Sequence, residues 1–115
     1  MGKRNEIVEI SFEFALAIIE YVELLEGQKK HVIAKQLLKS GTSIGANIRE
    51  SQSAESKADF IHKLKISAKE AEESAYWLRL CEHSKSYPTP TDEVKSKLLS
   101  IQKLLSKIIA TSKQK

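Results

Sequence analysis

Cysteine, proline and glycine are scarce in this chain of 115 residues, which has one Cys, two Pro and four Gly. With Cys81 alone, neither an intramolecular disulfide nor a zinc site built from cysteines can form, and a reducing, cytoplasmic setting is favoured. The low glycine and proline content, with 41% hydrophobic residues, excludes a disordered or low-complexity protein. The longest apolar run, Phe14 to Ile19, is far too short to cross a membrane, and we expect no signal peptide at residues 1–11.

Apolar residues recur at helical spacing in four segments of the chain, and no strand pattern accompanies them. We expect helices over about residues 5–26, 29–52, 57–84 and 90–111. Short connections place consecutive helices antiparallel to one another. The pattern therefore predicts a single domain, residues 1–115, with an all-α fold: an antiparallel up-down four-helix bundle.

The first segment carries two apolar stripes. One follows alternating three- and four-residue steps, as the seam of a packed helix does: Ile7, Ile10, Phe14, Ala17, Tyr21 and Leu24. The other lies beside it: Phe12, Leu16, Ile19 and Val22. A second stripe fits either a wide contact with two neighbouring helices or a contact with another subunit, and the sequence leaves both open.

The second segment contains poor helix formers at residues 40–45, where two glycines cost roughly 1 kcal/mol each relative to alanine. The apolar period nevertheless continues through them without a change of phase: Ile33, Leu37, Gly41, Ile44 and Ile48. We therefore expect one continuous helix whose small residues let a neighbouring helix approach closely.

Local signals mark the helix ends. Ser56 and Asp59 match a capping box, Gly27 is a plausible stop for the first helix, and Pro90 is expected as the first helical residue of the last one. The third helix should bury this seam: Ile61, Leu64, Ala68, Ala71, Ala75 and Leu78. The fourth should bury Val94, Leu98, Ile101, Leu105 and Ile108.

Motifs for catalysis or metal binding are missing. Asp59 and His62 form the one Asp/Glu-x-x-His pair, and Asp59 already has a capping role. No strand–turn–helix elbow surrounds Ser43 or Cys81, and Cys81 is expected to be a small buried hydrophobe. We therefore expect a protein that is not an enzyme, with no catalytic residue, metal, cofactor or small-molecule substrate.

Basic residues are the one signal that points to an outside partner. The net charge of +4 is uneven: residues 1–26 carry two basic and six acidic side chains, residues 27–53 five basic and one acidic, and residues 92–115 six basic and two acidic. Such residues either form a solvated face or bind nucleic-acid phosphates with little sequence specificity. The candidates for RNA or DNA binding are Lys29, Lys30, Lys35, Lys39, Arg49, Lys103 and Lys107.

The stretch from Ser43 to Glu50 resembles the Ser-Ile-x-x-Asn-Ile-x-Glu signature of the four-helix-bundle family of 23S rRNA intervening-sequence proteins. The similarity continues through residues 57–67, 69–74 and 76–78. One departure is Arg49-Glu50-Ser51, where the family often has Ala-Glu-Gly.

The resemblance implies a four-helix bundle without enzymatic activity that assembles as a homopentamer. Related proteins are encoded within insertions in ribosomal RNA genes, and a similar accessory protein of diversity-generating retroelements works with a reverse transcriptase and nucleic acid. The resemblance also implies structural hydrogen bonds between the second and third helices, made by Ser43, Asn47, Glu50 and Glu70. We expect a non-enzymatic oligomeric scaffold that binds RNA or DNA through a basic surface; the alternative is a protein–protein interaction module without nucleic-acid binding.

Overall fold

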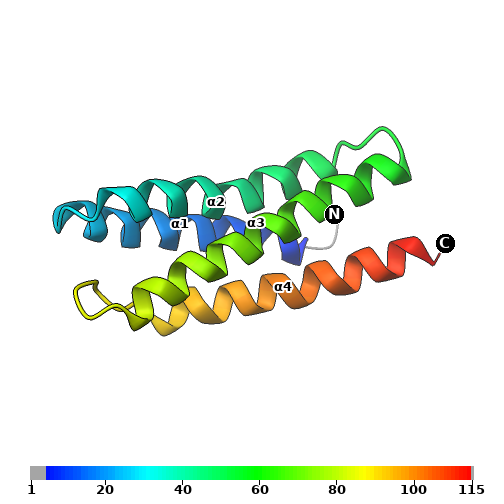
Figure 1. Cartoon of the computed structure of the whole chain (residues 1–115). Helices are drawn as coiled ribbons and strands as arrows, with labels where there is room; N and C mark the ends of the chain where they lie inside the picture. Colours follow the sequence, from blue (N-terminus) through cyan, green and yellow to red (C-terminus); the bar gives the residue numbers. More distant parts are fainter. Residues whose placement is uncertain (1–4, 115) are drawn as a thin grey trace.

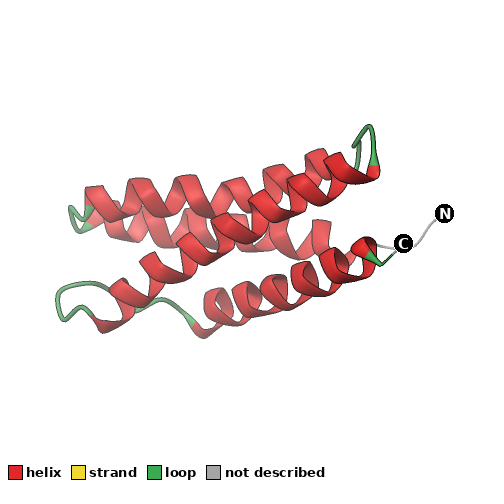
Figure 2. Ribbon diagram, turned by 45° about the vertical axis from the view of Figure 1, so that its right-hand side comes forward, coloured by secondary structure: helices red, strands yellow, loops and turns green. Residues whose placement is uncertain are grey.

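The computed structural model describes residues 5–114 and contains four α-helices: α1 (Glu6–Gly27), α2 (His31–Ser51), α3 (Lys57–His83) and α4 (Asp92–Lys113). Each helix packs against the next one along the chain, and α1 also packs against α4, so that α2 and α4 lie at opposite corners (Figures 1 and 2). This arrangement confirms the predicted all-α, antiparallel up-down bundle.

Side-chain caps begin α3 and α4. The Ser56 hydroxyl accepts a hydrogen bond from the Asp59 amide at 3.0 Å, as predicted, and the Asp59 carboxylate reaches back to the Glu55 amide at 3.2 Å. At α4 the Thr91 hydroxyl accepts from the Val94 amide at 3.2 Å. The prediction that Pro90 opens this helix was wrong: Thr91 takes the capping position, and α4 starts two residues later than expected.

The end of α1 has an unusual left-handed residue. The helix includes Gly27 as its last residue, one past the predicted end, so Gly27 is not the left-handed stop that we expected. The amides of Lys29 and Lys30 donate to the carbonyls of Glu26 and Leu25, each at 2.9 Å. These two bonds form a Schellman motif. Its left-handed position is occupied by Lys29 at φ 62°, where glycine is usual, at a cost of roughly 1–2 kcal/mol.

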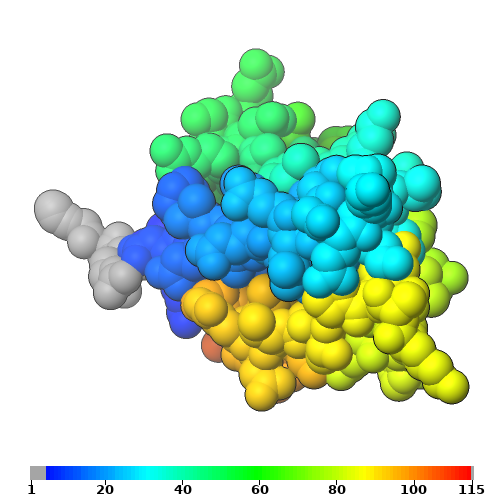
Figure 3. All heavy atoms as spheres, turned by 90° about the vertical axis from the view of Figure 1, so that its left-hand side faces the viewer, coloured from blue at the N-terminus to red at the C-terminus, as the bar shows by residue number. Residues whose placement is uncertain are grey.

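The α1–α2 turn and the α3–α4 loop lie together at one end of the bundle. The Lys30 ammonium lies 5.1 Å from the centroid of the Tyr87 ring, which is a cation–π contact between these two connections. Figure 3 looks onto this end, where the cyan α1–α2 turn lies against the yellow loop. The N-terminal end of α1 and the C-terminal end of α4 are therefore at the other end of the bundle.

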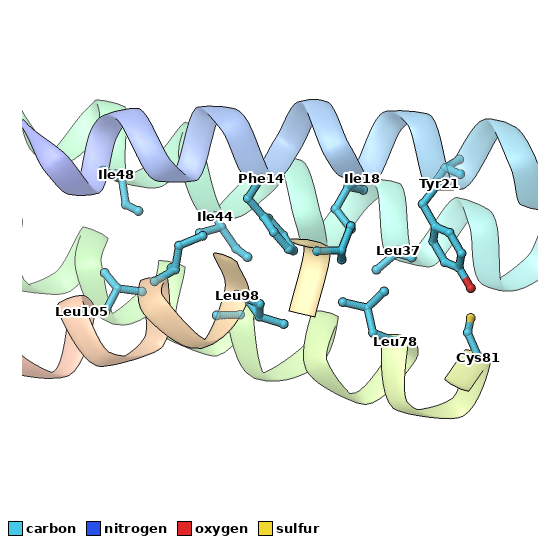
Figure 4. Packing of buried hydrophobic residues seen from close by; sticks show 14 of the residues in the cluster. Phe14, Ile18, Tyr21, Leu37, Ile44, Ile48, Leu78, Cys81, Leu98 and Leu105 are labelled. Carbon is cyan, nitrogen blue, oxygen red and sulfur yellow. The ribbon is translucent and has the colours of Figure 1, made fainter. Parts of the chain in front are cut away.

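The core stripe of α1 differs from the predicted one. Its buried residues are Ile7, Ser11, Phe14, Ile18, Tyr21, Val22 and Leu25. Ile10 and Ala17 are only half-buried, and Leu24 is 47% exposed. In both the predicted and the observed stripe, mostly apolar residues recur every three or four positions, so the spacing alone could not distinguish them. Figure 4 shows Phe14 and Ile18 directed into the core that the other helices surround.

Helix α2 is continuous through its glycines, as predicted. A Cβ added to Gly41 would lie only 3.0 Å from the Ile18 side chain, and one added to Gly45 would lie 3.4 Å from the Ser11 carbonyl oxygen. The small residues therefore let α1 approach the α2 backbone closely, which offsets their poor helix propensity.

The seam of α3 is also shifted by one residue from the prediction. The buried residues are Leu64, Ser67, Ala71, Ser74, Leu78 and Cys81. Ile61, Ala68 and Ala75 are half-buried. Serine takes positions that we assigned to alanine because each hydroxyl finds a partner on α2. On α4 the predicted Val94, Leu98, Ile101 and Leu105 are buried, while Ile108 is half-buried.

Candidate nucleic-acid interface

The basic residues singled out in the sequence lie in three separate places. On α2 the exposed ones are Lys35, Lys39 and Arg49, and on α4 they are Lys103 and Lys107. Lys29, exposed, and Lys30, half-buried, belong to the α1–α2 turn. Because α2 and α4 lie at opposite corners of the bundle, these residues do not form one continuous surface within the chain.

The lysines of α4 join residues of α3 instead. Two shallow hollows run between these helices, and we call the surface that lines them the α3–α4 groove. Its residues are Ala68, Lys69, Glu72, Gln102, Lys103, Ser106 and Lys107. Lys69 was not among the residues predicted from the sequence. Lys65, Lys69 and Glu72 are three to four residues apart, and this spacing, which places side chains on one face of a helix, could have identified it.

Two further lysines meet at the end of this groove. Lys65 precedes Lys69 by one helical turn, and Lys113 is in the last turn of α4. Lys113 lowers the pKa of Lys65 below its ordinary value, because the Lys113 ammonium can donate a hydrogen bond only to a neutral Lys65 amine and repels a charged one. The two side chains therefore lie close together.

Surface ion pairs occupy other lysines. Lys63 contacts Glu50 at 2.9 Å, Lys95 contacts Glu82 at 2.7 Å, and Lys97 contacts Glu13 at 3.2 Å. Within residues 5–114, no salt bridge uses the groove lysines Lys69, Lys103 and Lys107, and the same holds for Lys35, Lys39 and Arg49 of α2. The groove lysines are thus available to an external anion.

The hydrogen bonds between α2 and α3 differ from those expected. The Asn47 amide donates to the Ser43 carbonyl at 2.9 Å, within α2, because the two residues are one turn apart. Glu50 reaches α3 through Lys63, at the surface, and Glu70 is half-buried. The contacts of Ser43, Asn47 and Glu70 in this chain therefore do not bridge the two helices.

Buried serines make the inter-helix bonds. The hydroxyls of Ser40 and Ser74 are 2.8 Å apart, and the Ser67 hydroxyl donates to the Ile44 carbonyl at 2.8 Å. All three serines are fully buried. Ser67 and Ser74 could have been identified from the sequence, because they form one series with Leu64, Ala71 and Leu78 in steps of three and four residues.

Cys81 is fully buried at the loop end of the core, as expected of a small hydrophobe. Burial raises the pKa of its thiol, and Figure 4 shows the Tyr21 hydroxyl directed toward its sulfur. Burial likewise raises the pKa of Tyr21, whose hydroxyl donates to the Pro88 carbonyl at 2.5 Å. This bond ties the α3–α4 loop to α1.

A second surface stands out on α1, on the side away from α3. Four large apolar side chains are exposed there, and we call them the α1 apolar face: Phe12, Leu16, Ile19 and Leu24. Phe12 is 63% exposed and borders a hollow lined by Ala15, Ala46 and Arg49 among others. Val22 belongs to the core, so the second stripe of the sequence divides between the interior and this face.

In residues 5–114, no three His, Cys, Asp or Glu side chains lie together as metal ligands would. None of the four helices is both long enough and apolar enough to cross a bilayer.

The fold and these surfaces define a class: a small antiparallel four-helix bundle with a lysine-rich groove on one side and an exposed apolar helix face on the other. Residues 3–107 match the family of 23S rRNA-intervening sequence proteins, and the chain belongs to that family.

The chain is also similar to a crystal structure from Bacteroides thetaiotaomicron, that of a protein of unknown function from the S23 ribosomal protein family. The two chains share 44% sequence identity with a TM-score of 0.81, over 90% of this chain and 97% of the other. No curated protein matches the sequence.

Proposed function

We propose that this protein is a non-enzymatic oligomeric scaffold, a homopentamer, that binds RNA or DNA through a basic surface. The observation that carries the proposal is the set of groove lysines that make no ion pair within residues 5–114. Lysines in this state release counterions when they contact phosphates, and that release favours binding. The lack of a nucleophile elbow around Ser43 or Cys81 in the sequence supports the non-enzymatic part.

The nucleic-acid part is tested by filter binding of RNA and DNA over a salt series. We expect retention at low salt that falls steadily as salt rises, because the contacts are to the phosphate backbone. If neither RNA nor DNA is retained at low salt, the nucleic-acid part of the proposal is wrong.

The oligomeric part is supported by the α1 apolar face. Large apolar side chains exposed together mark surfaces that associate with protein. Light scattering should give a mass about five times the 12.9 kDa of one chain. Phe12→Asp should lower that mass toward one chain, whereas Val32→Asp, at a still more exposed site on α2, should leave it unchanged. A wild-type mass equal to that of one chain would refute self-association.

The same face favours a second function, a protein–protein interaction module without nucleic-acid binding. A pull-down with and without nuclease separates the two. Partners that are lost after nuclease treatment support the scaffold on nucleic acid, and partners that persist while filter binding is negative support the interaction module.

A further inference from the structure

We infer that the α3–α4 groove binds a single strand of nucleic acid, with its lysines on the phosphates and Tyr76 stacked against a base. The inference rests on the proposed function and deepens it, because it assigns the binding to one face and to one form of nucleic acid. It also excludes the α2 residues Lys35, Lys39 and Arg49 from the interface.

The charge of the groove is the first argument. Lysines line it from both helices: Lys69 on α3, and Lys103 and Lys107 on α4. The carboxylate that lines its hollows is Glu72.

The shape of the surface favours a single strand over a duplex. Lys103 and Lys107 are one turn apart, a rise of about 6 Å along the helix, so they can reach successive phosphates of an extended strand. Proteins that read a duplex place a helix or a β-ribbon in its major groove. Here α3 and α4 pack side by side, and residues of both helices line the hollows between them.

Tyr76 supplies an aromatic surface in line with the groove. It follows Glu72 by one turn on α3, and its side chain is 58% exposed. Its ring meets the Trp77 ring edge-to-face, with centroids 5.5 Å apart, and the Trp77 indole N–H donates to Glu73 at 3.2 Å. This contact restrains the tyrosine while its ring remains accessible, as base stacking requires.

The position of the groove is compatible with self-association through α1. The α1 apolar face belongs to the helix that packs between α2 and α4, whereas the groove lies on the side of the bundle formed by α3 and α4. A second copy that covers Phe12, Leu16 and Ile19 would therefore leave the groove lysines open.

Fluorescence anisotropy with the full chain tests the inference. The probes are one labelled single-stranded RNA, the same sequence as single-stranded DNA, and the matching duplex. The triple variant Lys69→Gln/Lys103→Gln/Lys107→Gln should weaken single-strand binding by about tenfold or more and reduce its salt dependence. The matched triple Lys35→Gln/Lys39→Gln/Arg49→Gln removes the same charge from α2 and should change the Kd less than about twofold.

Two single variants test the details of the groove. Glu72→Gln removes the opposing carboxylate and should tighten binding. Tyr76→Ala should weaken single-strand binding by about tenfold, within the range known for base–aromatic stacking, and leave duplex binding unchanged. If RNA and DNA bind equally, the protein recognises phosphates and bases. If RNA binds more tightly, the protein also recognises the 2′-hydroxyl.

Four results would overturn the inference. If the α2 triple loses binding and the groove triple does not, the groove assignment is wrong while the proposed function stands. If the duplex binds more tightly than either single strand, the single-strand assignment is wrong. If polyglutamate competes as well as unlabelled RNA, the surface recognises acidic protein instead. If wild-type protein binds no nucleic acid, both proposals fail.

Discussion

The contacts of α2 and those of α4 hold the bundle together in different ways. At α2 small residues bring backbones close: Gly41 lies against Ile18, and Ser67 bonds to the Ile44 carbonyl. At α4 larger side chains fill the core, with surface ion pairs to α1 and α3. Close backbone approach leaves no room for a change of volume, whereas longer side chains leave hollows beside them. The two sides should therefore tolerate added volume differently at the backbone contacts themselves, although a hollow also adjoins α2 beside Phe12.

Substitutions that add side-chain volume should show the largest difference in stability between the α2 side and the α4 side of the bundle. Gly41→Leu places four carbon atoms where Ile18 already lies within 3.0 Å of the first, and we expect a loss of about 3 kcal/mol in the free energy of unfolding. Ala68→Leu is the matched change on the α4 side, where a hollow of about 220 Å³ adjoins it, and should be nearly neutral. Urea denaturation measures both, and equal losses would contradict the contrast.

The serine contact between α2 and α3 should give the next largest effect. Ser40→Ala leaves the Ser74 hydroxyl buried without its partner, which should cost about 1–2 kcal/mol. In the double variant Ser40→Ala/Ser74→Ala neither hydroxyl is left buried without its partner. Its loss in the free energy of unfolding should therefore be smaller than the sum of the losses in the single variants. Additive losses in this double-mutant cycle would show that the two hydroxyls act independently.

The ion pair of α4 should matter least. Lys95→Gln removes the 2.7 Å contact with Glu82, which lies in water-exposed surroundings. Exposed ion pairs contribute little, so the thermal midpoint should barely change, and it should respond to salt in the same way as wild type. A large drop in the midpoint would mean that α4 depends on this pair more than on its buried side chains.

Several features were predictable because their causes are local. The capping serine of α3 was identified from Ser56 and Asp59 alone, since a cap involves residues within one turn. The buried residues of α4 from Val94 to Leu105 were found because that helix has a single apolar stripe. On α1 and α3 a second line of apolar or small residues had the same spacing, so only part of each seam was predicted: Ile7, Phe14 and Tyr21 on α1, and Leu64, Ala71 and Leu78 on α3.

The candidate site was predicted only in part, for a related reason. Lys103 and Lys107 stood out because residues 92–115 are basic as a block. Lys65 and Lys69 did not, because residues 54–91 carry six basic and six acidic side chains, and this balance hides which of them face α4. Charge along the chain therefore indicated a basic surface without showing where it lies.

By itself, the sequence determined four helices, their order, most of their ends and the family, because helical periodicity, caps and signature residues are local properties. The tertiary structure decided which stripe of α1 and α3 enters the core, and that α2 and α4 occupy opposite corners. Those choices depend on contacts between residues far apart in the chain. They separate the lysines of α2 from those of α4 and place the latter beside Lys65 and Lys69.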